Sequence, residues 1–154
     1  MKFNNIDITK WERSSVFNLF SKVHDPIFSI GLRIQTPTDF VDKLKSKNMK
    51  PFIALLYSVS TACNNVENFR YRLGDKNSVK LYDRVHPAWV ELDSKSQLVL
   101  KTCKYDDDFF QFTKDFKSSN ALEVDDEFAH GPYISTSTQP WYDLTSLSNI
   151  KFFF

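Results

Sequence analysis

The stretch PFIALLYSVSTAC, residues 51–63, is the most apolar part of this 154-residue chain. It begins with Pro51 and is followed by Asn64 and Asn65. We interpret it as a buried helix, although its β-branched residues leave a buried strand as the alternative. The rest of the fold has to be arranged around this segment.

Short strand-like segments follow the apolar stretch. A turn at Leu73–Asn77 precedes segments at 79–85, 88–92 and 97–103, and Asp93–Ser96 reads as a hairpin loop between the last two. These spacings predict antiparallel strands. Further along, three acidic residues precede a stripe of Phe side chains at helical spacing, which predicts a helix with one apolar face. The stripe is Phe109, Phe112 and Phe116, after Asp106–Asp108.

The two ends of the chain carry weaker patterns. Residues 6–11 predict a short strand or an extended entry to the fold. Ser14 or Ser15 predicts a helix cap, and the alternating Phe28, Ile30, Leu32 and Ile34 predict a half-buried strand. Thr36 and Pro37 predict a helix start. Residues 118–132 are loop-like, and 133–138, 141–144 and 150–154 predict strands. This mixture of helices and hairpin-like strands predicts a single α+β domain over residues 1–154.

Composition excludes several classes of protein. The formal net charge of +1 gives no electrostatic case for nucleic acid or an anionic membrane. Three glycines argue against a Gly-rich phosphate loop. The first residues lack the apolar core of a signal peptide, and no run reaches the length of a membrane span. Cys63 and Cys103 lack metal-type spacing, so we expect reduced core thiols in a cytoplasmic protein.

An ordered set of short motifs spans nearly the whole chain and resembles the chloramphenicol acetyltransferase family. No single motif is decisive, but their order and spacing are those of the family. In chain order they are Asp7-Ile8 with Trp11-Glu12-Arg13, Phe28-Ser29-Ile30, Ala62-Cys63-Asn64, Phe69-Arg70, Tyr82-Asp83-Arg84-Val85-His86-Pro87, Asp107-Asp108-Phe109-Phe110-Gln111-Phe112, and Ser135-Thr136-Ser137-Thr138-Gln139-Pro140-Trp141.

The resemblance implies a two-layer α/β sandwich that assembles as a trimer and a role in antibiotic resistance. It implies transfer of an acetyl group from acetyl-CoA to a hydroxyl of chloramphenicol, with a histidine as general base. It places Ser137, in the S-x-x-P-W segment, as the group that stabilises the oxyanion. It also places Leu19, Phe20 and His24 in the acceptor pocket, and it implies no metal.

The family's histidine belongs to an H-H-x-x-x-D-G motif, which none of His24, His86 and His130 matches. We therefore expect the domain to be incomplete at its C-terminus, with the general base absent. In the family the arginine of W-x-R pairs with the aspartate of that motif, so Arg13 would lose its partner. Exposed sheet edges and apolar faces are expected to follow.

The sequence leaves three functions open. The first is an acetyl-CoA-dependent O-acyltransferase by descent, inactive as this isolated chain. The second is a catalytically dead remnant or an acceptor-binding module. The third is a subunit that contributes a pocket to a full-length homologue, because the family's active site lies between subunits. The partners expected are a chloramphenicol-like hydroxyl acceptor and either a homo-trimer or a hetero-assembly.

Several residues invite a catalytic interpretation beside a plainer one. His130 could replace the missing base or be an exposed loop residue, and we favour the loop residue. His86 beside Pro87 reads as structural, and His24 as either a pocket or a turn residue. Asp106–Asp108 resemble a metal cluster but fit a helix start better. Nothing near either cysteine suggests the lowered pKa of a nucleophile.

Overall fold

The apolar stretch forms a 15-residue helix, α3 (Pro51–Asn65), in the computed structural model of the protein. The structure describes residues 1–24, 26, 29–74, 78–122, 128 and 130–138. Pro51 lies at the start of the helix, where its missing N–H group is not needed. Ile53, Leu56 and Cys63 of α3 are buried. The helix prediction is therefore confirmed over the strand alternative.

The larger sheet has the strand order β6-β5-β4-β7. Strands β4 (His86–Leu92) and β5 (Leu98–Thr102) form the predicted antiparallel hairpin, and the short β6 (Asn120–Ala121) extends it on the β5 side. Strand β7 (Tyr133–Thr136) pairs with the other edge of β4 in the parallel direction. The α+β class is confirmed, with one parallel pairing inside a mainly antiparallel arrangement.

The smaller sheet has the order β1-β3-β2 and is antiparallel throughout. It consists of β1 (Phe3–Ile6), β3 (Val79–Tyr82) and β2 (Tyr71–Leu73), the last preceded by the 3-10 helix η1 (Glu67–Arg70). Of the strand or extended entry predicted at 6–11, Ile6 alone belongs to a strand. Asp7 accepts hydrogen bonds from the backbone and hydroxyl of Thr9, and this local turn ends the strand at Ile6.

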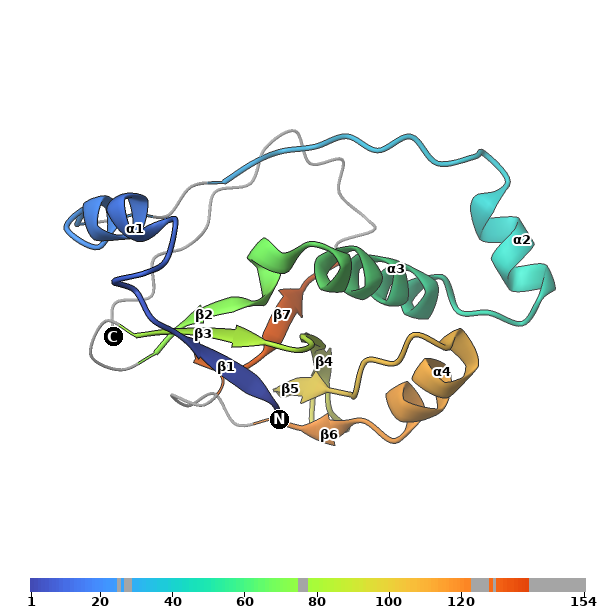
Figure 1. The fold of residues 1–154 in the computed structure, drawn as a ribbon. Coiled ribbons are helices and arrows are strands. Elements are labelled where there is room, and N and C mark those ends of the chain that lie inside the picture. Colours follow the sequence, from blue (N-terminus) through green and yellow to red (C-terminus); the bar gives the residue numbers. More distant parts are fainter. Residues whose placement is uncertain (25, 27–28, 75–77, 123–127, 129, 139–154) are drawn as a thin grey trace.

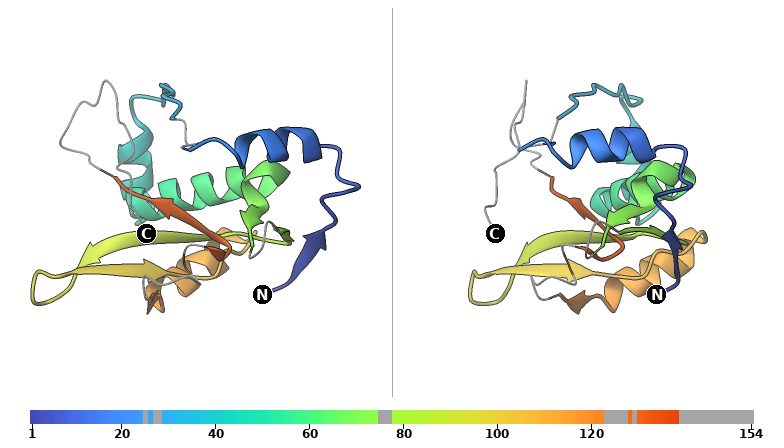
Figure 2. Two further views of the ribbon diagram at one scale, coloured as in Figure 1. Left: turned by 90° about the vertical axis from the view of Figure 1, so that its left-hand side faces the viewer. Right: turned by 60° about the vertical axis from the view of Figure 1, so that its left-hand side comes forward.

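The core lies between α3, the larger sheet and α4 (Phe109–Lys117). Helix α3 lies along one face of the larger sheet (Figures 1 and 2). The side chain of Phe112 is fully buried, and the ring of Phe116 stacks on that of Trp89 with centroids 4.8 Å apart. Aromatic rings in such offset contacts add to the energy of burial. The predicted Phe stripe is thus core.

The N-terminal third differs most from the predictions. Helix α1 (Ser14–Phe20) begins at Ser14 without a side-chain cap, and α2 (Phe40–Ser46) begins after Pro37 because residues 37–40 first close a turn. The predicted strand around Ile30 pairs with no described strand. Ile30 is 72% exposed. An alternating apolar pattern forms a strand only where the edge of a neighbouring strand is available for pairing, and the pattern itself cannot supply that edge. Among the described residues, no helix is long and apolar enough to cross a membrane.

Candidate functional site

The start of strand β7 is held by the side chain of Arg72. Its guanidinium donates from Nε to the carbonyl oxygen of Gly131 (2.9 Å) and from Nη2 to that of Tyr133 (2.7 Å). Its Nη1 donates to the carbonyl oxygens of Phe69 and Tyr71. A charged, planar donor that binds four carbonyls fixes the relative position of the chain segments that carry them. Arg72 therefore joins β2 to the beginning of β7.

Ser137 directly follows the last residue of β7. The parallel pairing runs from His86 opposite Tyr133 to Trp89 opposite Thr136, so the ladder ends one residue before Ser137. Ser137 is exposed, and its hydroxyl forms no hydrogen bond with another described residue. Such a hydroxyl is free to donate to the oxygen of an incoming carbonyl group. Residues 139–141, which complete the S-x-x-P-W segment, lie outside the described residues.

The three residues predicted for the acceptor pocket lie on or just after α1. Leu19 is 63% exposed, Phe20 is 49% exposed, and His24 is also exposed. Helix α1 has no buried residue. Figures 1 and 2 show α1 away from the C-terminal end of β7. The structure therefore leaves all three side chains exposed on or just after α1 and does not bring them to Ser137.

Arg13 has partners within this chain, contrary to the expectation of an unpaired charge. Its Nη1 donates to Oδ1 of Asn68 (2.7 Å), and its guanidinium lies 5.8 Å from the centre of the Tyr71 ring. Its Nε also lies 3.9 Å from a carboxylate oxygen of Glu12. Cation–π and hydrogen-bonding contacts of this kind suit a half-buried guanidinium. The Arg13 side chain thus links the turn before α1 to the smaller sheet.

Two of the histidines lie at the opposite end of β7 from Ser137. His86 begins β4 opposite Tyr133, and its Nδ1 accepts a hydrogen bond from the backbone N–H of Tyr105 (3.0 Å). Nδ1 of His130 is 3.0 Å from the carbonyl oxygen of Leu73. Ser137 lies four residues beyond Tyr133 along extended chain, a distance of roughly 13 Å. Neither ring is therefore placed to take a proton from a group held at Ser137.

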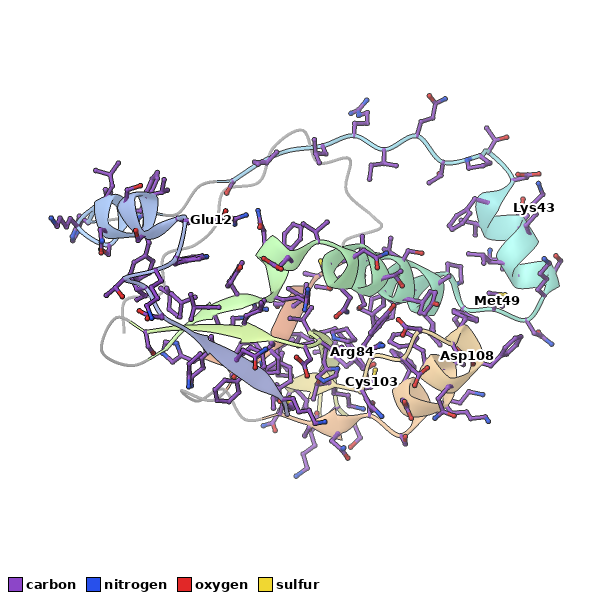
Figure 3. The ribbon with its side chains drawn as sticks, in the orientation of Figure 1. Glu12, Lys43, Met49, Arg84, Cys103 and Asp108 are labelled. Carbon is purple, nitrogen blue, oxygen red and sulfur yellow. The ribbon has the colours of Figure 1, made fainter. Side chains whose placement is uncertain are left out.

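The acidic run before α4 is a helix start. Asp108 accepts a hydrogen bond from the backbone N–H of Gln111 (2.7 Å), the pattern of an N-cap. Asp107 forms an ion pair with Arg84, and this hydrogen bond lowers the pKa of the Asp107 carboxyl group. Figure 3 shows Arg84 and Asp108 among the side chains below α3. Within the described ranges, no three His, Cys, Asp or Glu side chains gather in a way that could hold a metal ion.

Both cysteines are buried free thiols. Burial raises the pKa of Cys63, and it raises that of Cys103 to about 12. A nucleophilic thiol needs the opposite shift, toward the thiolate at neutral pH. The interpretation as core thiols fits the structure, and a role as a nucleophile does not.

No sequence motif marks Arg72, although its side chain orients the strand that leads to Ser137. No local pattern could have found it, because its partners lie 59 and 61 residues away in the chain. An arginine beside an exposed segment looks the same in sequence whether it is solvated or bound to carbonyls. The parallel pairing of β7 with β4 was missed for the same reason.

The chain matches the family model for chloramphenicol acetyltransferase over residues 1–151. It is 27% identical to a chloramphenicol acetyltransferase of Clostridium butyricum over 75% of this chain and 53% of that protein. It is 24% identical to those of Clostridium perfringens and Staphylococcus aureus, over 96% of this chain and 70% and 71% of those proteins. The match thus spans about half the length of the first relative and more of the other two.

A solved structure of a chloramphenicol acetyltransferase superimposes on the chain with a TM-score of 0.81 at 23% sequence identity. The superposition covers 97% of this chain and 75% of that one. At this level of identity the likeness shows the fold. It agrees with the arrangement of helices and sheets described above.

Proposed function

Because the chain belongs to the chloramphenicol acetyltransferase family, we propose that it takes part in moving an acetyl group from acetyl-CoA to a hydroxyl of a chloramphenicol-like acceptor. Family membership supports acyl transfer in general. The observation that carries the finer proposal is Ser137, whose exposed hydroxyl stands at the end of a firmly held strand. Rigid placement matters because a donor must be aimed at the developing charge before the reaction begins.

The proposed reaction has a simple balance of bonds. The acceptor oxygen attacks the thioester carbonyl carbon while a base removes the hydroxyl proton. The carbonyl oxygen becomes an oxyanion, to which the hydroxyl of Ser137 donates a hydrogen bond. The carbon–sulfur bond then breaks, and the leaving thiolate takes up the proton from the base. Removing one such donor typically lowers the rate by about 10²- to 10³-fold.

The general base is the part that the described residues do not supply. His86 and His130 lie at the far end of β7 and are engaged by Tyr105 and Leu73, and His24 is on the exposed surface that follows α1. We therefore propose that the 154-residue chain does not turn over by itself. A homo-trimer of this chain would lack the base in every subunit, so the base would come from a full-length homologue in a hetero-assembly.

The acceptor side of this proposal uses the open surface around α1. Leu19, Phe20 and His24 together offer two apolar side chains and one polar ring, which suits a mainly apolar acceptor with a few polar groups. A neighbouring subunit that covered this surface would also exclude water from the reacting groups. The free thiols Cys63 and Cys103 fit a reducing compartment such as the cytoplasm.

The first test is CoA release from acetyl-CoA with chloramphenicol, measured on the purified chain. We expect no turnover, together with chloramphenicol binding that calorimetry detects. Turnover by the chain alone would contradict the proposed need for a second subunit, and His24→Asn, His86→Asn and His130→Asn variants would then identify the base. Absence of both turnover and binding would remove the acceptor site from the proposal.

The second test asks whether Ser137 acts in a mixed assembly. The Staphylococcus aureus enzyme, with its own S-x-x-P-W serine replaced by alanine, is co-expressed with this chain. We expect the chain to restore CoA release, and the Ser137→Ala chain to restore at least about 10² less. The exposed Ser135→Ala variant is the matched control, since Ser135 lies on the same strand. Equal rescue by all three chains, or no co-purification, would count against the shared site.

A further inference from the structure

A pocket lies at the other end of β7 from Ser137. It has a volume of about 650 Å³ and is open to solvent. It lies where the N-terminal residues meet the ends of β3 and β5 and the start of β7. The side chains that matter here are Lys2, Arg84, His86, Lys104, Asn120 and Tyr133. Figure 3 shows two residues that line it, Arg84 and Cys103, close together beneath α3.

The wall of this pocket is held in place by backbone contacts. The N–H of Asp83 donates to the carbonyl oxygen of Lys2 (3.2 Å), which extends the β1–β3 pairing by one step. The carbonyl of Asp83 in turn accepts from Nη1 of Arg70 (3.2 Å). Lys104 follows the buried Cys103 directly after β5. Two lysines therefore line one cavity, Lys2 just before β1 of the smaller sheet and Lys104 just after β5 of the larger sheet.

The charges around the pocket are mainly positive. Lys2 and Lys104 form no ion pair with any described carboxylate, whereas Arg84 is paired with Asp107. Asp83 is the acidic side chain in the wall. Burial lowers the pKa of His86, and the positive charges of Lys104 and Arg84 lower it further. Lys104 and Arg84 thus lie close enough to His86, which lines the same pocket, to oppose its charged form.

The pocket also has a fixed hydrogen-bond donor and apolar surface. Since Nδ1 of His86 accepts from the backbone of Tyr105, the neutral ring carries its proton on Nε2. The ring of Tyr133 stacks on Phe128 with centroids 5.8 Å apart, which holds an aromatic surface beside the lysines. A pocket with these groups suits a small molecule that has a charged head group and an apolar body.

We propose that this pocket binds a small organic anion, a carboxylate or a phosphate monoester with an apolar body. The head group lies between Lys2 and Lys104 and accepts a hydrogen bond from Nε2 of His86. The apolar part lies against Tyr133. The site is separate from the acyl-transfer site proposed above, because the two lie at opposite ends of β7.

The test uses benzoate, phenyl phosphate and the uncharged benzamide as probes, titrated into the chain and followed by two-dimensional NMR. We expect either anion to shift the resonances of His86 and Lys104, with benzamide at least about tenfold weaker because it lacks the charge. Preference for one of the two anions identifies the head group. Equal binding of benzamide, or no shift at about 10 mM anion, overturns the proposal.

Matched variants separate a specific site from general attraction. The Lys2→Gln and Lys104→Gln double variant is expected to weaken anion binding about tenfold. Lys22→Gln with Lys114→Gln, which removes the same charge from exposed positions outside the pocket, should change it less than about twofold. Ser137→Ala should leave anion binding unchanged, which keeps this result independent of the acyl-transfer proposal. Equal loss in both double variants would reduce the effect to net charge.

Discussion

The side chain of Asn64 pairs in both directions with the backbone of Val85. Oδ1 of Asn64 accepts from the N–H of Val85, and its Nδ2 donates to the carbonyl oxygen of Val85, each over 2.9 Å. Nδ2 also donates to the carbonyl oxygen of Ser60 within α3. The Asn64 amide therefore forms with Val85, the residue just before β4, the two backbone hydrogen bonds that a neighbouring strand would form. These bonds fix the end of α3 against the larger sheet.

Removing this amide should destabilise the fold. We expect Asn64→Ala to lower the free energy of unfolding by about 1–3 kcal/mol, because the backbone groups of the fully buried Val85 lose their partners. Urea denaturation measures the change. Asn65→Ala is the control, since Asn65 is exposed and lies one residue further along the same helix end. A similar loss in both variants would mean that helix-end propensity, and not the Val85 pairing, matters.

Phe112 and Phe110 offer a second matched pair on one helix. Phe112 is 0% exposed and packs into the core cluster, while Phe110 is 75% exposed. We expect Phe112→Ala to cost about 3–5 kcal/mol through lost burial and the cavity left behind. Phe110→Ala should change stability by less than roughly 0.5 kcal/mol. Thermal and chemical denaturation of both variants decide whether α4 is positioned by this one face.

The lowered pKa of His86 predicts a pH dependence of stability. In the unfolded chain the ring binds its proton near pH 6.5, whereas in the folded protein burial, with Lys104 and Arg84 nearby, opposes the charged form. The unfolded state thus binds more protons between the two pKa values. Stability is fully present above pH 6.5 and is lost as the pH falls through the folded pKa.

Urea denaturation between pH 8 and pH 5 measures this effect in a buffer without organic anions. His86→Asn keeps an acceptor for the N–H of Tyr105 but cannot be protonated, so its stability should vary less with pH over this range. His24→Asn replaces an exposed histidine and should retain the pH dependence of the original chain. An unchanged slope in His86→Asn would exclude His86 as its source.

Cys103 should be unreactive toward thiol reagents in the native state. Its pKa of about 12, raised by burial, implies roughly a thousandfold less thiolate at pH 8 than an ordinary thiol has. We expect a disulfide reagent to label it only at the rate at which the core opens, and fully in urea. A Cys63→Ser variant isolates the Cys103 signal. Rapid labelling of the folded variant would contradict the burial of this thiol.

The parts that sequence predicted well are those with strong local patterns. Helix α3, the β4–β5 hairpin and helix α4 each carry a periodic apolar face, and these faces meet in the core around Leu56, Trp89 and Phe112. The order of the family's motifs predicted the overall fold, which the structural likeness confirms. Local pattern and tertiary packing agree in these segments, so prediction succeeded there.

The predictions failed where structure depends on distant partners. The strand expected around Ile30 has the right alternation but no described strand beside it, and the strand expected at 6–11 is replaced by a turn that Asp7 makes with Thr9. Arg13 was expected to be unpaired and instead contacts Asn68 and Tyr71. The role of Ser137 and of the acceptor residues stays a prediction.

The anchoring of β7 by Arg72 has a consequence for how the protein folds. Its bonds to Gly131 and Tyr133 span 59 and 61 residues, so forming them requires a long loop to close. Contacts that close long loops form slowly, and β7 lies at the edge of its sheet, where local opening is easier. In hydrogen exchange, the amides of β7 should therefore lose protection before those of α3. A partly unfolded chain that had lost the bonds of Arg72 would keep its core but lose the alignment of its serine.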